Sequence, residues 1–312
     1  MDLKAAVVLT IYNGAKYIVA QLDSIRSQTR KPDEVIILDD CSKDNSVNLV
    51  SSFIAQYHLN SWHIIINEKN VGWKANFMKG FALAEKDNQI IFCSDQDDVW
   101  NCKKIEEMLQ IMEENPKINV LACNLTVFYE NEPGVLRAGK STLAKYGKTD
   151  LALVSFDKRW IEPKRPGCSY CFRSSFLGLL ESVWFSDCPH DLLLWAAGVA
   201  TGSLYIVNRP LLSQRRHQTV STPSNVKNQG IRCRNLEIQR TLTNNLLSKY
   251  DVFDLSKSQI LFLQKYSFVL TERIKAISNK NFWCFLLLLF RLKYYPKPTS
   301  WLGDLKSSFH HE

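Results

Sequence analysis

The pattern of apolar and polar positions divides the first 125 residues of the chain into strand-like and helix-like segments that alternate regularly. Short apolar runs, of the length of buried strands, occupy residues 5–9, 34–38, 63–66 and 89–93. Between and after them lie segments with apolar residues at helical spacing, at 16–27, 46–57, 73–85 and 103–114. Strands alternating with helices in this way predict an α/β fold, with a mostly parallel sheet covered by helices on both faces. This is a nucleotide-binding type of half-domain.

The pattern changes after residue 120. Residues 119–129 again suit a strand, whereas residues 130–165 are polar and predict a long excursion near a site. Further strands are expected at 168–172, 204–207 and 211–213, and a helix at 192–200. From residue 230 onward helical spacing dominates. We therefore predict one domain over 1–220, with halves at 1–125 and 126–220, and a helical C-terminal region over 221–312.

Composition narrows the class of protein. The chain has 312 residues, of which 46% are hydrophobic and 22% charged, as in an ordinary globular protein. Its nine cysteines are odd in number and scattered, which favours reduced thiols over a disulfide framework. The segment before the first strand is too short for a signal peptide. These features predict a cytoplasmic protein.

Charge is distributed unevenly. Residues 1–208 carry 22 Lys and Arg against 25 Asp and Glu, whereas residues 209–312 carry 17 against 6. This asymmetry predicts an acidic partner for the C-terminal part, such as a membrane surface, a phosphate-bearing substrate or nucleic acid.

An apolar, aromatic run at residues 282–290 lies within the basic region. It is too short to span a bilayer and is flanked by Lys280, Arg291 and Lys293. Two interpretations stay open. The segment 280–305 is a peripheral anchor at the membrane interface, or the run is a helix packed on the main domain or on a second copy in a homodimer.

The strongest chemical signal is a cluster of carboxylates. Asp95, Asp97 and Asp98 fall within four residues, directly after the apolar run at 89–93. The C-terminal edge of such a sheet is where ligands bind. Crowded carboxylates repel one another unless a cation or proton offsets them, and hard divalent cations prefer oxygen ligands. The cluster therefore predicts a metal ion that carries a substrate phosphate, with a solvated turn or a helix N-cap as the alternative.

Similar polar clusters end the other early strands. The sequences are VVLTIYNG at 7–14, SIRSQT at 24–29, DEVIILDDCSKD at 33–44, NVG at 70–72 and DQD at 95–97. In this order they resemble family 2 of the glycosyltransferases, which are inverting enzymes of GT-A fold. Residues 165–220 resemble bacterial rhamnosyltransferase-like members more weakly, through PHD at 189–191 and RRH at 215–217.

The resemblance implies a site for a nucleotide-sugar donor. Tyr12 would lie against the base, and Asp40 would accept a hydrogen bond from the imide N–H that uracil and thymine share. The alternative role for Asp40 is to cap a helix. Lys74 would border the ribose and diphosphate, and its alternative is an ordinary solvated position on a helix. The implied donor-binding residues are Thr10, Tyr12, Asn13, Asp40, Asn70, Gly72, Lys74, Asn76, Asp95 and Arg216.

The resemblance also implies a metal and a base. Asp95 and Asp97 would hold Mn²⁺ or Mg²⁺, with His217 as a further ligand. The residues that follow His217 differ from the sequence that usually follows this histidine in the family. Asp191 would be the base that deprotonates the acceptor hydroxyl. The alternative for Asp191 is an N-cap, and His190 is a weaker substitute as the base.

The sequence thus indicates a metal-dependent inverting glycosyltransferase that uses a UDP- or dTDP-sugar, with L-rhamnose as the preferred sugar. The expected acceptor is a bacterial surface glycan or lipid-linked oligosaccharide at the inner face of the cell membrane. Transfer of glucose, galactose or N-acetylhexosamine from UDP is the alternative within the same fold.

Two other classes are less consistent with the sequence. A nucleotidyltransferase normally has a Gly-rich basic loop after the first strand, whereas residues 10–14 contain one glycine and no arginine. A nucleic-acid-binding protein would concentrate its basic residues in a recognisable motif, which the C-terminal third lacks. We expect no nucleic-acid partner.

Overall fold

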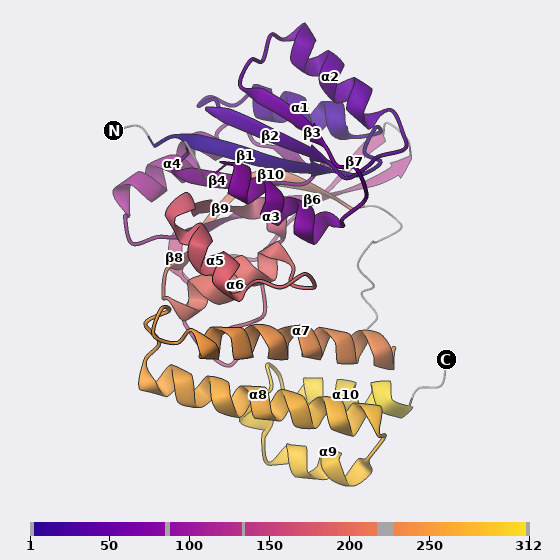
Figure 1. The fold of residues 1–312 in the computed structure, drawn as a ribbon, viewed down its shortest axis with the longest axis vertical. Coiled ribbons are helices and arrows are strands. Elements are labelled where there is room, and N and C mark those ends of the chain that lie inside the picture. The colour runs from indigo at the N-terminus through magenta and orange to yellow at the C-terminus, as the bar shows by residue number, and fades with distance from the viewer. Residues whose placement is uncertain (1–2, 85–87, 133–134, 217–227, 310–312) are drawn as a thin grey trace.

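The computed structural model describes residues 3–84, 88–132, 135–216 and 228–309. A ten-stranded mixed sheet runs through its centre in the order β3-β2-β1-β4-β9-β6-β10-β5, with β7 paired to β6 and β8 to β10 (Figure 1). The strands are β1 (Ala5–Ile11), β2 (Glu34–Asp39), β3 (Trp62–Ile66), β4 (Ile90–Ser94), β5 (Val99–Trp100), β6 (Val120–Glu132), β7 (Val135–Thr142), β8 (Leu151–Leu153), β9 (Tyr170–Arg173) and β10 (Leu204–Arg216).

The first four strands form the predicted parallel half of the sheet. β1 pairs in parallel with both β2 and β4, and β2 pairs in parallel with β3. The second half is mixed, because β9 lies antiparallel between β4 and β6, whereas β6 and β10 are parallel to each other. The predicted α/β fold with a flanked, mostly parallel sheet is confirmed.

Side-chain alternation along the strands sorts the core into two layers. On β1, Val7 and Leu9 face the cluster with α1 (Ile18–Arg26), α2 (Ser46–Gln56) and α4 (Lys104–Glu114). Ala6 and Val8 face the cluster with α3 (Trp73–Ala84), α5 (Leu177–Val183) and α6 (His190–Ala200). Both faces are therefore buried, which explains why the strands are apolar without alternation in the sequence.

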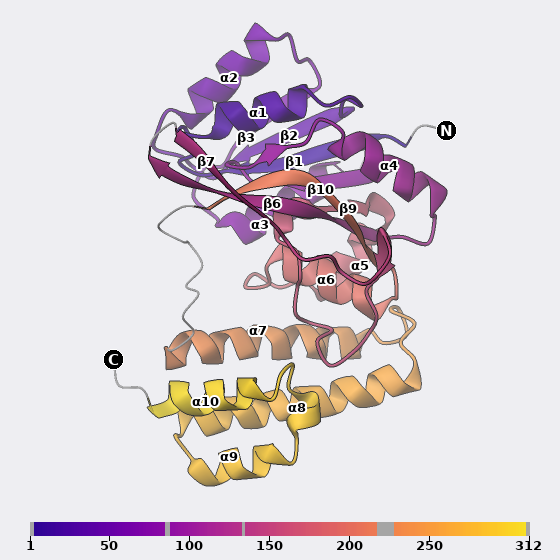
Figure 2. The same ribbon diagram turned by 180° about the vertical axis from the view of Figure 1, so that it is seen from behind.

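The C-terminal helices stack beyond α5 and α6, so that α9 lies at the opposite end of the molecule from α2 (Figures 1 and 2). They are α7 (Gln229–Ser248), α8 (Lys257–Ser278), α9 (Phe282–Leu289) and α10 (Thr299–Phe309). One hydrophobic cluster continues from the sheet through α6 into these helices. Hydrogen bonds join the two parts as well, for instance from Gln259 Nε2 to the Ala200 carbonyl at 2.9 Å. The division into domains at residue 220 stays a prediction.

Two expected features differ in the structure. For residues 130–165 we expected a long excursion near a site and named no strand, and the structure places the end of β6, then β7 and β8 there. Pairing with β6 and β10 supplies hydrogen bonds to these polar segments, which the sequence pattern alone does not reveal. The strands expected at 204–207 and 211–213 are one strand, β10, with register shifts around Pro210. Proline lacks an N–H, so the ladder is irregular there but is not ended.

All nine cysteines are free thiols, as predicted. Among the helices that the structure describes, none is both long and apolar enough to cross a membrane.

Candidate active site

A cavity of about 630 Å³ lies at the C-terminal ends of β1, β2 and β4, where the sequence predicted a ligand site. The second half of the chain closes it, through Gly167, the start of α6 and the end of β10. Most of the predicted site residues line this cavity: Thr10, Tyr12, Asp40, Asn70, Gly72, Asn76, Asp95, Asp97, Asp191 and Arg216. Asn13 and Lys74 do not, and His217 lies outside the described residues.

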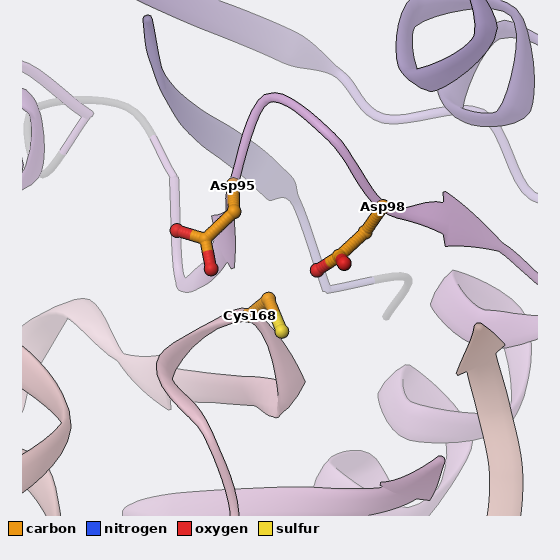
Figure 3. A group of neighbouring side chains, drawn as sticks. All are labelled: Asp95, Asp98 and Cys168. Carbon is orange, nitrogen blue, oxygen red and sulfur yellow. The ribbon is translucent and has the colours of Figure 1, made fainter. Parts of the chain in front are cut away.

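The loop between β4 and β5 carries the acidic cluster. Asp95, Asp98 and Cys168 each offer a ligand atom, and these atoms lie within 4.8 Å of one another (Figure 3). Asp98 Oδ1 accepts a hydrogen bond from the Arg215 backbone N–H at 3.2 Å. Its Oδ2 is buried without a partner among the described residues. Because Asp98 leads into β5 rather than into a helix, the helix N-cap that the sequence offered as an alternative for this cluster does not apply to it.

The electrostatics of this cluster favour a cation. Burial, followed by repulsion from Asp98, Asp97 and Asp191, raises the pKa of Asp95 well above its usual range. Burial and the nearby Asp97 raise the pKa of Asp98 to about 6. Burial and mutual repulsion thus disfavour the charged form of both carboxyl groups, a cost that a bound cation would offset, and the partnerless buried oxygen of Asp98 is a ready ligand. The residues therefore fit a hard divalent ion such as Mn²⁺ or Mg²⁺.

On the opposite side of the cavity, Asp40 organises the loop before α3. Its Oδ1 accepts from the Val71 N–H and its Oδ2 from the Gly72 N–H, both at 2.8 Å. Asn67 also donates to Oδ1, at 3.0 Å. Gly72 has φ +82°, which explains why glycine stands in this turn. The carboxylate thus holds the 70–72 loop, and Oδ2 has the greater capacity left for a ligand N–H.

Three predicted donor residues are engaged in packing the loops. Asn76 is fully buried and donates to the Leu38 carbonyl at 3.1 Å, which ties α3 to β2. Asn13 accepts from the Lys43 N–H at 2.8 Å and joins the loops after β1 and β2. Lys74 donates to the Asp187 carbonyl at 2.7 Å. Tyr12, in contrast, is 48% exposed and lines the cavity.

Asp191 lies in the first turn of α6 and lines the same cavity as the acidic cluster. Its Oδ1 accepts from the Leu192 N–H at 2.8 Å, while Pro189 occupies the N-cap position. Burial raises the pKa of Asp191 above the usual value for a carboxyl group. A carboxylate of raised pKa is a stronger base, and it stands on a rigid element at the cavity wall.

His190 is less suited to act as the base. Its ring lies against Phe77, with centroids 3.9 Å apart, and meets Trp73 edge-on. Burial lowers its pKa to about 3. A Cβ at Gly167 would lie 2.2 Å from His190 Nε2, so the glycine leaves room for the ring, and neither ring nitrogen makes a hydrogen bond to a described residue.

Several cavity residues were not anticipated from the sequence. Gln96 and Gln214 line the cavity, and Cys168 lies beside the acidic cluster. Gln96 stands between Asp95 and Asp97, so the acidic motif itself marks its position. Cys168, in the turn before β9, and Gln214, on β10, come from distant parts of the chain, and no local motif marks them.

Comparisons with known proteins agree with this geometry. A family model described as glycosyl transferase family 2 matches residues 6–176. The dTDP-rhamnosyl transferase RfbG of Shigella flexneri is 26% identical over 70% of this chain and 74% of its own length. An uncharacterized glycosyltransferase of Nostoc sp. is 27% identical over 63% of this chain, and the match spans 58% of that relative's length.

Solved structures show the same fold. The TarS 1–349 fragment of S. aureus in complex with UDP-GlcNAc superposes with a TM-score of 0.63, at 16% identity, over 99% of this chain and 82% of that one. The mannosyltransferase PcManGT of Pyrobaculum calidifontis, in complex with GDP-Man and Mn²⁺, gives 0.53 at 14% identity, over 99% and 85%. At these identities the likeness shows the GT-A fold alone.

Proposed function

The chain belongs to family 2 of the glycosyltransferases, and from that premise we propose that it moves a sugar from a UDP- or dTDP-sugar to a hydroxyl group of a bacterial surface glycan or lipid-linked oligosaccharide. One observation carries this proposal. The acidic cluster, the exposed ring of Tyr12 and the carboxylate of Asp191 all line a single cavity. These groups are what is needed to hold a nucleoside diphosphate at one end and to accept a proton at the other.

In the proposed reaction, Asp191 accepts the proton of the acceptor hydroxyl while its oxygen bonds to the anomeric carbon. The bond from that carbon to the diphosphate breaks on the opposite side, and the nucleoside diphosphate leaves with the electron pair. One displacement of this kind inverts the anomeric configuration. Arg216, which lines the cavity at the end of β10, is the proposed contact of the diphosphate.

The proposed metal ligands are Asp95 and Asp97, and Asp98 stands beside them with its orphaned oxygen. When bound, Mn²⁺ or Mg²⁺ would neutralise the charge that grows on the leaving diphosphate. In support, PcManGT was solved with Mn²⁺ on the same fold. His217 stays a proposal from the sequence.

The donor sugar is proposed to be L-rhamnose, carried by dTDP. This choice is supported by the similarity to RfbG, whose name gives that activity. A UDP-hexose or UDP-N-acetylhexosamine is the alternative, supported by the TarS complex with UDP-GlcNAc.

A donor panel tests the proposal. The purified chain is incubated with dTDP-rhamnose and with UDP-glucose, UDP-galactose and UDP-GlcNAc, each with and without Mn²⁺, and release of UDP or dTDP is measured. We expect Mn²⁺-dependent release from one donor, with dTDP-rhamnose the first candidate. If the protein released pyrophosphate from nucleoside triphosphates instead, or bound RNA or DNA and no donor, the proposal would be wrong.

We also propose that α9 rests on the inner face of the membrane, where a lipid-linked acceptor would lie. Phe290, Trp283 and Leu287 are 84%, 74% and 67% exposed, so the helix presents a bare apolar face. No Asp or Glu occurs between residues 273 and 303, whereas Lys280, Arg291, Lys293 and Lys297 flank the helix. Exposed aromatic residues beside unopposed cations are typical of a segment that sits at an anionic interface.

Vesicle sedimentation tests this placement. We expect binding to vesicles that contain phosphatidylglycerol, weaker binding to pure phosphatidylcholine, and loss of binding in Trp283→Ser/Phe290→Ser. Tyr250→Ser, which changes an exposed aromatic residue on the α7–α8 connection, is the matched control. If the double variant instead converted a dimer to a monomer and left vesicle binding unchanged, α9 would be a homodimer surface.

A further inference from the structure

Two loops that carry different parts of the site are joined by one side chain. The Tyr12 N–H donates to Gln96 Oε1 at 2.8 Å, and Gln96 Nε2 donates to the Tyr12 carbonyl at 3.2 Å. The carboxamide of Gln96 therefore pairs with both backbone groups of Tyr12, as a neighbouring strand would. Tyr12 belongs to the loop after β1, and Gln96 lies between Asp95 and Asp97 in the acidic loop.

The chain leaves room for this pairing at Gly14. A Cβ atom at Gly14 would lie 2.5 Å from Gln96 Oε1 and 2.8 Å from its Cδ, which is closer than carbon and oxygen atoms can approach. The φ of Gly14 is not positive, so glycine is required here by space and not by backbone conformation. Residue 14 is thus small because the Gln96 side chain occupies the position of its Cβ.

The other side of the loop after β1 is fixed independently. The Asn13 N–H donates to Ser42 Oγ at 2.9 Å, and the Gly14 N–H donates to Ser46 Oγ at 2.8 Å. These contacts hold the loop to the β2–α2 connection. Gln96 therefore links this anchored loop to the acidic loop.

From this geometry we propose that Gln96 is a positioning residue that sets the distance between the base platform at Tyr12 and the metal-binding acids. The inference rests on the proposed function, because it assumes that a nucleoside diphosphate spans the two loops. A ligand that binds at two points gains affinity only when both points are held at the spacing it requires. Losing the Gln96 pairing should therefore weaken the ligand that spans both loops more than a ligand that touches one.

Binding measurements on Gln96→Ala test this. By calorimetry, we expect the dissociation constants of UDP and dTDP in the presence of Mn²⁺ to rise about tenfold, which corresponds to two modest hydrogen bonds in a partly exposed site. Binding of uridine or thymidine without metal, and of Mn²⁺ without nucleotide, should change less than twofold. Gln110→Ala, which changes an exposed glutamine on α4, is the matched control and should leave all constants unchanged.

Gly14→Ala provides a second, independent way to break the pairing between Gln96 and Tyr12. Its added methyl group should displace the flexible end of Gln96, so it should weaken Mn²⁺–UDP or Mn²⁺–dTDP binding as Gln96→Ala does. The double variant should bind no worse than either single variant, because both changes break one contact.

The outcomes separate the inference from the proposed function. Unchanged Mn²⁺–nucleotide binding in Gln96→Ala, or an equal loss of nucleoside binding, would overturn the positioning role while the wild type still binds its donor. A wild type that binds no nucleotide would overturn both the proposed function and the positioning role. The contact itself is still tested in that case, since additive losses of unfolding free energy for Gly14→Ala and Gln96→Ala would show that the two residues do not interact.

Discussion

At the scale of single residues, Asp191 is the group whose role the chemistry defines most sharply. We expect Asp191→Asn to lower kcat by about 10²–10⁴-fold, because the amide cannot accept the hydroxyl proton. The dissociation constant for the nucleotide sugar should stay within about twofold, since the proposed donor-binding residues lie on other loops. Asp187→Asn is the matched control, as Asp187 is an exposed partner of Lys74 and Arg234. Near-normal turnover in Asp191→Asn would remove it from the role of base.

The acidic cluster predicts a dependence of stability on pH. The pKa values of Asp95 and Asp98 are raised on folding, that of Asp98 to about 6, so the folded protein holds protons that the unfolded chain releases. Their stabilising contribution is full below the usual carboxyl pKa of about 4 and is lost as pH rises through about 6. Without metal, we expect Asp98→Asn to be more stable than the wild type at about pH 7.5, and this advantage to shrink at about pH 5.

Thermal unfolding with and without Mn²⁺ tests whether these carboxyl groups bind the metal ion. The ion binds the folded state and should raise the Tm of the wild type more at about pH 7.5 than at about pH 5, because protons compete for the same oxygens. A Mn²⁺ shift that is the same at both pH values would mean that these carboxylates are not the ligands.

The sequence reveals residues at strand ends more readily than residues that tertiary structure brings in. Tyr12, Asp40 and Asp95 follow apolar runs, so the topology of an α/β sheet already places them at one edge. Cys168 lies beside the acidic cluster, and Gln214 lines the cavity, only because β9 and β10 join the sheet beyond β4, and no periodicity of the sequence shows that arrangement. The hydrogen bonds of Asn76 with Asn67 and the Leu38 carbonyl were not apparent from the sequence either.

At the scale of elements, the packing of α3 on the sheet depends on a glycine that lets the helix approach β1 and β2 closely. A Cβ at Gly80 would lie 2.4 Å from Val8 Cγ1 and 2.7 Å from Leu38 Cδ1. We expect Gly80→Ala to lower the free energy of unfolding by about 1–3 kcal/mol, because overpacking pushes the helix from the strands. Urea unfolding measures this directly.

Gly178→Ala is the matched control, since Gly178 lies in α5 and its Cβ would meet nothing within 4 Å. It should leave stability unchanged or raise it by up to about 1 kcal/mol through helix propensity. A loss equal to that of Gly80→Ala would show that packing against β1 and β2 is not the cause.

The hydrophobic periodicity of the sequence predicted the elements of residues 1–125 well, because the strands there are apolar and each is separated from the next by a helix. It failed for β7, which mixes polar and apolar residues, and for β8, which is only three residues long, and it divided β10 at Pro210. Strands of this kind are defined by their partners more than by their own composition.

At the scale of the whole molecule, a buried ion cluster ties the last helix to the others. Asp304 on α10 is fully buried, and it accepts from Arg273 Nε on α8 at 2.7 Å and from Arg232 Nε on α7 at 2.6 Å. Sequence periodicity predicted helices here but could not pair one acid with two arginines that lie 31 and 72 residues away.

Removing the shared acid should loosen the helical end without altering the cavity. We expect Asp304→Asn to lower the free energy of unfolding by about 3–5 kcal/mol, because two guanidinium groups lose their counter-charge and Arg273 is almost completely buried. Asp251→Asn, at an exposed position before α8, should change it by less than about 0.5 kcal/mol. Below its unfolding transition, Asp304→Asn should bind Mn²⁺ and UDP or dTDP as the wild type does, since the cluster lies on helices that contribute no residue to the cavity. A parallel loss of nucleotide binding would mean instead that the helical end and the catalytic cavity open as one cooperative unit.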